Sequence, residues 1–190
     1  MTTIGFIRHG STHWNKEGRA QGSSDIPLDE DGLAEAEKLA ERIGSEKWDF
    51  IYSSHLLRAK QTADRIGGRA GIPVWSDERI REAGGGEIEG TTEQERIAKW
   101  GAGWRELDLG IEKPESVIAR GRSFLDEVLS RHKGKRILIV SHGSFIRTML
   151  NHLLPGSEYD GHLTNTSVTT LVLEDRDWTC GLYNCTKHLE

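Results

Sequence analysis

Two short stretches, far apart in the sequence, share one pattern in which an apolar run ends in a polar residue, a histidine and a glycine. The first is Phe6-Ile7-Arg8-His9-Gly10 and the second is Ile139-Val140-Ser141-His142-Gly143. In α/β proteins, ligands bind outside the carboxyl ends of the parallel strands. The repeated pattern therefore predicts that the two histidines face one pocket at the end of a largely parallel sheet.

The rest of the chain alternates strand-like and helix-like segments, which predicts a three-layer α/β/α sandwich with a mostly parallel central sheet. The length of 190 residues fits one domain covering residues 1–190. The expected strands are Thr3–Ile7, Phe50–Tyr52, Ile72–Trp75, Arg136–Val140 and a hairpin of Ser167–Leu173 with Trp178–Tyr183. The expected helices are Leu33–Ile43, Leu56–Ile66, Thr92–Trp104, Val117–Leu129 after an N-cap at Ser116, and Phe145–Leu154.

Three local expectations accompany these elements. Residues His13–Asp31 are polar and rich in glycine, so we expect a loop there. Gly67-Gly68 is expected to end its helix. Trp100 and Trp104 are four residues apart, which favours core packing on one helix face over a wall of the substrate pocket.

Composition narrows the classes of partner. The formal net charge is −5, from 25 Lys and Arg against 30 Asp and Glu, which argues against nucleic acid as the main partner. No signal-peptide pattern and no apolar run of membrane-spanning length occurs, so we expect a cytoplasmic protein with no membrane partner. Cys180 and Cys185 lack zinc-site spacing and are expected to be free thiols.

The residue types at Arg8-His9-Gly10 suit an oxyanion. Arginine offers a rigid fork of donors for phosphate, and histidine can act as a nucleophile near neutral pH. The sequence contains no Gly-x-Ser-x-Gly, Walker A, Gly-x-Gly-x-x-Gly after a strand or His-Glu-x-x-His, so sites of those kinds are unsupported. The histidines and acidic residues lack the spacing of metal ligands along the chain. A metal site with ligands from distant strands stays an open alternative.

The run from Arg8 to Asn15 resembles the first signature of the histidine phosphatase superfamily, in its phosphoglycerate mutase-like branch. The resemblance continues in the same order over nearly the whole chain. The further matching segments are Gln21–Leu28 with Gly32, Ser53–Ala63, Glu82 with Gly86, Glu89 and Gly90, Glu115-Ser116, and Ser141-His142-Gly143.

The resemblance implies a mostly parallel sheet with helices on both faces and one antiparallel edge strand. It also implies that His9 is the nucleophile that forms a phosphohistidine and that Glu82 is the proton donor. The implied phosphate-binding set is Arg8, Arg58 and His142, assisted by Asn15 and by the backbone at Gly10 and Gly143. No cofactor and no metal is required, because the cations come from the protein.

Physical chemistry adds three expectations to this assignment. A protonated imidazole on His142 would hold the phosphate together with two guanidinium groups. His9 must be neutral for attack, and its other ring nitrogen is expected to donate to a backbone carbonyl. An uncharged Glu82 would protonate the leaving group and, once ionised, activate water.

Several assignments stay open from the sequence. Glu87 or Glu89 could replace Glu82 as the donor, and Arg58 outside its motif would read as a solvated helix residue. Arg79 and Arg81 line the pocket entrance or are merely exposed. Three other histidines, His13, His55 and His162, are expected to be structural or solvent-facing.

Two departures from the family pattern bear on substrate preference. Ser11 stands where the family usually has an acidic or amide residue, and Ile88 stands where an aromatic residue is common. Neither is expected to touch the proposed catalytic core.

The compact span from Gly90 to His142 favours a phosphatase over a mutase, because an open pocket lets water reach a phosphohistidine. We therefore expect a metal-independent phosphatase whose partner is a small phosphorylated metabolite. The alternatives are a cofactor-dependent phosphoglycerate mutase and, from a different class, a non-catalytic module that binds phosphorylated ligands. The sequence predicts no oligomeric state.

Overall fold

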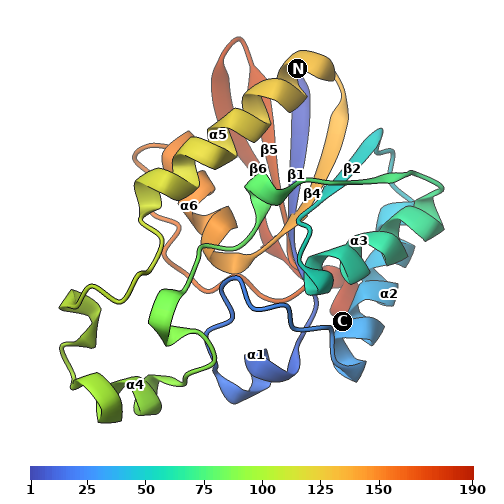
Figure 1. The fold of residues 1–190 in the computed structure, drawn as a ribbon. Coiled ribbons are helices and arrows are strands. Elements are labelled where there is room, and N and C mark those ends of the chain that lie inside the picture. Colours follow the sequence, from blue (N-terminus) through green and yellow to red (C-terminus); the bar gives the residue numbers. More distant parts are fainter.

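The computed structural model describes residues 1–190 and places six strands in one sheet with helices on both faces (Figure 1). This confirms the three-layer α/β architecture. The strands are β1 (Thr2–Arg8), β2 (Phe50–Ser53), β3 (Val74–Ser76), β4 (Arg136–Ser141), β5 (Val168–Glu174) and β6 (Asp177–Cys185), in the spatial order β3-β2-β4-β1-β5-β6.

Four neighbouring strands, β3, β2, β4 and β1, run parallel. The strand antiparallel to them is β5, which pairs with β1 on one side and with β6 on the other. The antiparallel strand therefore lies one position inside the sheet, and the expectation of an antiparallel edge strand is wrong. The hairpin connection explains this, because β5 and β6 are joined by a short turn and must pair antiparallel.

Helices cover both faces of the sheet. Figure 1 shows α2 and α3 on one side and α5 and α6 on the other, while α1 and α4 lie beyond the lower ends of the strands. None of the helices is both long enough and apolar enough to cross a membrane. The helices are α1 (His13–Glu17), α2 (Glu30–Gly44), α3 (Leu57–Ala70), α4 (Glu93–Trp100), α5 (Pro114–Arg131) and α6 (Gly143–Leu153), with 3₁₀ turns at Glu78–Ile80, Gly86–Ile88, Trp104–Glu106 and Lys187–Leu189.

The side chains of strand β4 are buried on both faces of the sheet. Its residues Ile137 and Ile139 belong to the apolar cluster beneath α5 and α6, whereas Leu138 and Val140 belong to the cluster beneath α2 and α3. Successive side chains of a strand point to opposite faces, so a strand covered on both sides needs an unbroken apolar run.

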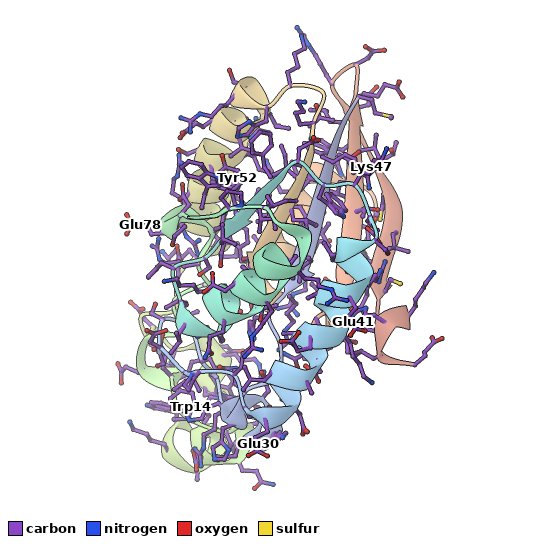
Figure 2. The ribbon with its side chains drawn as sticks, turned by 90° about the vertical axis from the view of Figure 1, so that its right-hand side faces the viewer. Trp14, Glu30, Glu41, Lys47, Tyr52 and Glu78 are labelled. Atoms are coloured by element: carbon purple, nitrogen blue, oxygen red, sulfur yellow. The ribbon has the colours of Figure 1, made fainter.

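The register of β1 and β4 brings the two repeated motifs together. The strands are parallel and Arg8 pairs with Ser141, so His9 and His142 follow at the same end of the sheet. Figure 2 shows Trp14 at the end of the molecule where Glu30 also lies, away from Lys47. The segments that follow the parallel strands therefore lie together at the carboxyl end of the sheet.

The stretch His13–Asp31 is not wholly a loop, because it begins with the short helix α1. Thr12 caps this helix by accepting from the Asn15 N–H, and Asn15 Oδ1 accepts from the Thr12 N–H. Gly18 ends it with a φ of 69°. The capping pair is Thr with Asn, whereas the usual pair is Ser or Thr with Glu or Gln. The sequence therefore lacks the usual signal for the start of this helix.

Two other helix boundaries differ from expectation. Helix α5 begins at Pro114 with Lys113 as its N-cap, because proline fits the first turn of a helix and Ser116 already lies inside it. Helix α4 ends at Trp100, and Trp104 lies in a separate 3₁₀ turn after Gly101, whose φ is 84°. Trp104 is buried, but the two tryptophans do not share a helix face.

Helix α3 runs through Gly67 and Gly68 and ends at Ala70, with Gly71 as its C-cap, so the expectation that Gly67-Gly68 ends the helix is wrong. Gly67 serves packing instead. A Cβ atom at Gly67 would lie 2.7 Å from Val74 Cγ2 and 2.8 Å from the Ile72 carbonyl oxygen. At Gly68 a Cβ atom would meet nothing within 4 Å.

These neighbouring glycines give a matched pair of stability variants. Gly67→Ala should destabilise the protein by about 1–3 kcal/mol, because the added methyl group forces β3 away from α3. Gly68→Ala should stabilise it by up to about 1 kcal/mol, because alanine favours the helix and fits the open space. Urea unfolding of both variants measures the difference. Equal effects of the two substitutions would contradict close packing at Gly67.

Candidate active site

A cavity of about 380 Å³ lies at the carboxyl end of the parallel strands. Its walls come from the end of β1, from α1 and the loop after it, from α3, from the segment after β3, and from the start of α6. The lining residues are Arg8, His9, Trp14, Asn15, Gly18, Arg19, Ala20, Gln21, Gly22, Arg58, Glu82, Ala83, Gly84, Gly85, Ile88, Arg96, Ile111, Ser144 and His162.

The two histidines predicted from the repeated motif lie together. Their ring centroids are 5.2 Å apart and the ring planes are inclined by 56°. His9 lines the cavity, whereas His142 is completely buried beside it. A backbone hydrogen bond of 3.0 Å from the His9 N–H to the Ser141 carbonyl fixes the two strand ends against each other.

His9 is held in one tautomer. Its Nδ1 lies 2.7 Å from the Gly10 carbonyl oxygen, which can only accept, so Nδ1 carries the hydrogen and Nε2 has a free lone pair. Burial, with the positive charges of Arg58 and Arg8, lowers the pKa of His9 well below its ordinary value. The imidazole is therefore neutral at neutral pH, as a nucleophile requires.

Arg58 is completely buried and projects from the first turn of α3. Its Nη1 donates to the Ser24 carbonyl (2.7 Å) and its Nη2 to the Gly22 carbonyl (2.9 Å). Burial lowers the pKa of the guanidinium to about 10, so it stays charged at neutral pH. The alternative of a solvated helix residue is wrong for Arg58.

Arg8 is fixed from the other side of the cavity. Its Nη1 donates to the Leu163 carbonyl and lies 2.9 Å from His162 Nε2. His162 therefore lines the cavity and contacts a candidate site residue, which the sequence did not reveal. Gly143 begins α6 close by, where an added Cβ atom would lie 3.3 Å from Arg8 Nε.

His142 is paired with Ser54, one of the small polar residues after β2. Its Nε2 lies 2.8 Å from Ser54 Oγ, which already accepts from the Leu56 N–H. The Ser54 hydroxyl is thus free to donate to Nε2, which leaves the imidazole hydrogen on Nδ1. Burial and the charge of Arg58 lower the pKa of His142 well below its ordinary value. Without an anion the imidazole is therefore neutral, and the protonated form that would hold a phosphate stays a prediction.

The unpaired nitrogens are the clearest sign of an anion site. Four buried side-chain polar atoms in the protein lack a hydrogen-bond partner: Arg8 Nε, Arg58 Nε, His142 Nδ1 and Arg96 Nε. Buried polar groups are nearly always paired, so each exception needs an explanation. All four belong to residues that line this cavity or adjoin His9, and all four are N–H donors. An oxyanion in the cavity would supply acceptors.

Glu82 is the one carboxylate on the cavity wall. Its Oε1 accepts from the N–H groups of Ala83 (2.8 Å) and Phe145 (2.9 Å), and its Oε2 accepts from the Ser144 N–H (3.1 Å). The carboxylate thus sits at the N-terminus of α6, where the helix dipole favours negative charge.

The alternative acids are placed elsewhere. Glu87 is exposed and does not line the cavity. Glu89 accepts from the Ser23 N–H (2.7 Å), the Gly85 N–H (3.0 Å) and the Ser24 hydroxyl (2.7 Å). It thereby fixes the loop whose carbonyls hold Arg58. The geometry favours Glu82 among the three acids.

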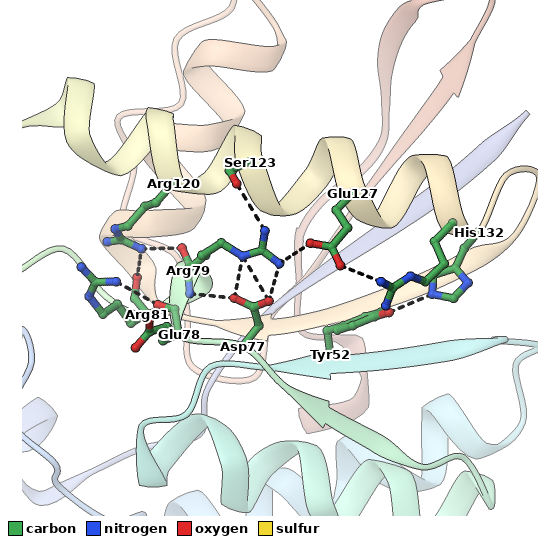
Figure 3. Close-up of polar contacts among 10 residues, drawn as sticks. Tyr52, Asp77, Glu78, Arg79, Arg81, Arg120, Ser123, Glu127 and His132 are labelled. Carbon is green, nitrogen blue, oxygen red and sulfur yellow. Dashed lines mark hydrogen bonds and ion pairs between the residues drawn. The ribbon is translucent and has the colours of Figure 1, made fainter.

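An ion pair behind the cavity holds the segment that carries Glu82. Arg120 Nη1 donates to the carbonyls of Arg79 (2.7 Å) and Arg81 (2.8 Å), which Figure 3 shows, and its Nη2 donates to the Glu82 carbonyl (3.1 Å). The same guanidinium pairs with both oxygens of Glu112 at 2.9 and 3.0 Å. Arg120 therefore positions the backbone of three residues at once.

Other residues that the sequence left open are now placed. Arg79 pairs with Asp77 and Glu127 on the side of the sheet near Tyr52, outside the cavity (Figure 3). Arg81 donates to the Glu78 carbonyl and does not line the cavity. His13 and His55, which were expected to be structural or solvent-facing, are exposed.

Residues behind the strand ends complete the site. Asn15 lines the cavity, and its Oδ1 is engaged by Thr12. The Gly10 N–H donates to Thr62 Oγ1 (3.1 Å), and Asn165 Nδ2 donates to the His9 carbonyl (2.9 Å). Asn165 comes from a loop more than 150 residues away in sequence, so no local pattern could have revealed it.

The two departures from the family pattern have different places. Ser11 is buried behind the site, where its hydroxyl donates to Asp29 Oδ2 (3.0 Å). Ile88 lines the cavity and makes part of its wall apolar. The structure contains no group of three or more His, Cys, Asp or Glu side chains placed to hold a metal ion.

Comparison with known proteins gives a consistent set of relatives. The model of the histidine phosphatase superfamily (branch 1) matches residues 4–186. Phosphoglycerate mutase-like protein 4 of Arabidopsis thaliana is 33% identical over 98% of this chain and 86% of its own length. The metal-independent phosphoserine phosphatase of the same plant is 32% identical over 100% and 84%, respectively. The structure of a mycobacterial glucosyl-3-phosphoglycerate phosphatase with VO3 has a TM-score of 0.88 at 30% identity and covers 96% of this chain and 99% of its own.

The ion pair of Arg120 and Glu112 predicts a pH-dependent contribution to stability. The hydrogen bonds from Arg120 and from the Gly84 N–H lower the pKa of Glu112 to about 2. A depressed folded-state pKa stabilises the protein above the unfolded value of about 4.3 and loses this effect as the pH falls towards 2. Glu112→Gln should therefore destabilise the protein by roughly 1–2 kcal/mol at pH 7, after allowance for solvent screening, and by about half as much at pH 3.

Urea unfolding at the two pH values measures this difference. The control is Glu115→Gln, three residues further on in the first turn of α5, whose side chain is exposed and has no hydrogen-bond partner, so its effect should be small at both pH values. A Glu112→Gln effect that stays constant from pH 7 to pH 3 would contradict the depressed pKa.

Proposed function

The chain belongs to the histidine phosphatase superfamily, branch 1, and we propose that it hydrolyses small phosphomonoesters, without a metal ion, through a phosphohistidine on His9. The observation that carries the proposal is a neutral His9 with a free Nε2 beside three buried N–H donors that lack partners. Phosphoryl transfer needs a nucleophile next to several N–H groups that are free to donate hydrogen bonds to the phosphate.

Phosphate binding would complete the buried polar network. The Nε groups of Arg8 and Arg58 and Nδ1 of His142 are free to donate to phosphate oxygens. Charge-assisted hydrogen bonds to such an anion are strong, and a preorganised set stabilises the charge that develops in the transition state. A bound dianion also favours protonation of His142, which would add a second charge to the site.

The first chemical step transfers the phosphoryl group to the protein. His9 Nε2 attacks the phosphorus atom, and the bond from phosphorus to the ester oxygen breaks. The leaving oxygen takes a proton from Glu82, so the products are an alcohol, a phosphohistidine and the Glu82 carboxylate. Glu82 lies on the wall of the same cavity as His9.

The second step returns the protein to its starting state. A water molecule gives a proton to the Glu82 carboxylate and attacks the phosphorus atom. The bond between phosphorus and Nε2 breaks, inorganic phosphate forms, and His9 is neutral again. The three backbone N–H groups that hold the carboxylate fix its oxygens in place for both proton transfers.

Hydrolysis is favoured over transfer to a second substrate by the form of the cavity wall. The span between Gly90 and His142 contains only α4, a 3₁₀ turn, a loop, α5 and β4, and the cavity-lining Ile111 on that loop is exposed. Water can therefore reach a phosphohistidine. The relatives named as phosphatases support the same choice, whereas the mutase-like relative keeps phosphoglycerate mutase as the second candidate.

Release of inorganic phosphate from a panel of phosphomonoesters in the presence of a chelator tests the proposal. The panel includes p-nitrophenyl phosphate, phosphoserine and 3-phosphoglycerate with and without 2,3-bisphosphoglycerate. We expect the wild-type protein to release phosphate and His9→Asn to lose at least about 10³-fold in kcat, because the nucleophile is gone.

The outcomes separate the candidates. The His9→Asn variant should keep the wild-type circular dichroism spectrum and melting temperature within a few degrees, so that loss of fold is excluded. Wild-type activity in that variant, or a rate that collapses with the chelator and returns with a divalent metal, would sink the phosphohistidine mechanism. Interconversion of phosphoglycerates with little phosphate release would favour the mutase.

The role of Glu82 predicts a dependence on the leaving group. Glu82→Gln removes the proton donor, so hydrolysis of alkyl esters such as phosphoserine should fall about 10²–10⁴-fold. Hydrolysis of p-nitrophenyl phosphate should fall much less in its first step, because nitrophenolate leaves without a proton. Pre-steady-state kinetics of both esters measure that step, with Glu87→Gln as the control. An equal loss for both esters would rule out general acid catalysis by Glu82.

A further inference from the structure

The cavity has an excess of positive charge beyond what a phosphate group requires. Its charged lining residues are four arginines and a single carboxylate, Glu82. Two of the arginines, Arg8 and Arg58, lie beside His9 and would meet the phosphate. The other two, Arg19 and Arg96, lie on the remaining walls.

The charge of Arg19 is already matched. Its guanidinium pairs with the carboxylates of Glu17 and Glu95, and it also donates to the Gly90 carbonyl at 2.7 Å. Arg19 is therefore not a candidate for binding a further anion.

The charge of Arg96 is not matched in this way. The side chain is buried, with the residue 9% exposed, and its Nε has no hydrogen-bond partner. Its one ion-pair partner is Glu93, at the long distance of 3.4 Å. Glu93 is itself held by Arg105 at 2.8 and 3.0 Å and by the Trp104 indole N–H at 3.1 Å.

Arg96 is also held rigidly. Its Nη1 donates to the Thr91 carbonyl at 2.9 Å, and its guanidinium carbon lies 4.9 Å from the centre of the Trp104 ring. A guanidinium fixed before binding loses little conformational entropy when it meets an anion. No sequence pattern points to this role, because Arg96 looks like any charged residue of a polar helix.

We propose that Arg96 forms a second anion subsite of the cavity and that it binds a carboxylate on the non-phosphate part of the substrate. The inference rests on the proposed phosphatase function and names the class of its substrate: a small phosphomonoester that also carries a carboxylate.

The charge count favours a single negative charge. A phosphate dianion matches Arg8 and Arg58, and Glu82 is neutral when it serves as the proton donor. Arg96 then shares the single carboxylate of Glu93 with Arg105, and a substrate carboxylate would complete its charge pairing with a planar pair of oxygens. The apolar wall residues Trp14, Ile88 and Ile111 suit a short carbon skeleton between the two anionic groups.

Matched pairs of substrates test the subsite. Phosphoserine and phosphoethanolamine differ only in the carboxylate, and 3-phosphoglycerate and glycerol 3-phosphate differ only in a carboxylate against a hydroxymethyl group. We expect the wild-type protein to prefer the carboxylated member of each pair by about tenfold or more in kcat/KM, as for a charged hydrogen bond. Arg96→Met should reduce each preference to near one, mainly through KM, and Arg96→Lys should retain part of it.

Two further variants locate the effect. Arg105→Met removes the other arginine that contacts Glu93 and Trp104, but Arg105 does not line the cavity, so the preference should persist. Arg147→Met removes a cation from an adjoining hollow of about 130 Å³ that Arg8 and His162 also line. Loss of the preference in Arg147→Met but not in Arg96→Met would overturn the proposal and place the second anion in that hollow.

Binding measurements keep the inference separate from the proposed function. Isothermal titration of the wild-type protein and Arg96→Met with phosphoserine, phosphoethanolamine and inorganic phosphate should show a selective loss of phosphoserine affinity. An equal loss for all three ligands, or no carboxylate preference in the wild-type protein, would refute the subsite even if hydrolysis proceeds. Absence of hydrolysis with a selective loss of binding would instead refute the phosphatase and leave the subsite standing.

Discussion

Positive charge buried without a buried counter-charge is the constraint on which this structure depends. Arg8 and Arg58 are buried at the end of the sheet, and their guanidinium groups contact backbone carbonyls and His162 rather than a carboxylate. Burying an unpaired charge is costly, so the surrounding backbone must solvate it. Carbonyl groups of Gly22, Ser24 and Leu163 take that part, and the loops that carry them are fixed accordingly. What remains unpaired is left for an anion.

The same charges set the chemistry of the two histidines. A buried imidazole beside two guanidinium groups loses its proton, so the pKa values of His9 and His142 both lie well below the ordinary value. A neutral His9 is nucleophilic, and a neutral His142 still offers an N–H. An arriving phosphate dianion would reverse the local potential. In the proposed mechanism, the protonation state of the site therefore depends on the bound ligand as well as on the protein.

The candidate proton donor is positioned from behind by a separate layer of interactions. Arg120, which is paired with Glu112, donates to the carbonyls of Arg81 and Glu82. N–H groups at the N-terminus of α6 donate to the Glu82 carboxylate. Because both supports come from helices packed on the sheet, the donor is tied to the same frame as the two histidines.

The sequence by itself determined the architecture and the centre of the site. Buried strands need unbroken apolar runs, and strand ends need the breaks seen at Arg8-His9-Gly10 and Ser141-His142-Gly143, so both are written locally. Only the tertiary structure decided that Glu82 rather than Glu89 faces the cavity and that Gly67 serves packing rather than helix termination. It alone also decided that Arg96 is buried, shares Glu93 with Arg105 and keeps an Nε atom without a hydrogen-bond partner. Those outcomes depend on contacts between segments distant in sequence, and burial and pairing of a charge are properties of the folded neighbourhood, which no local pattern encodes.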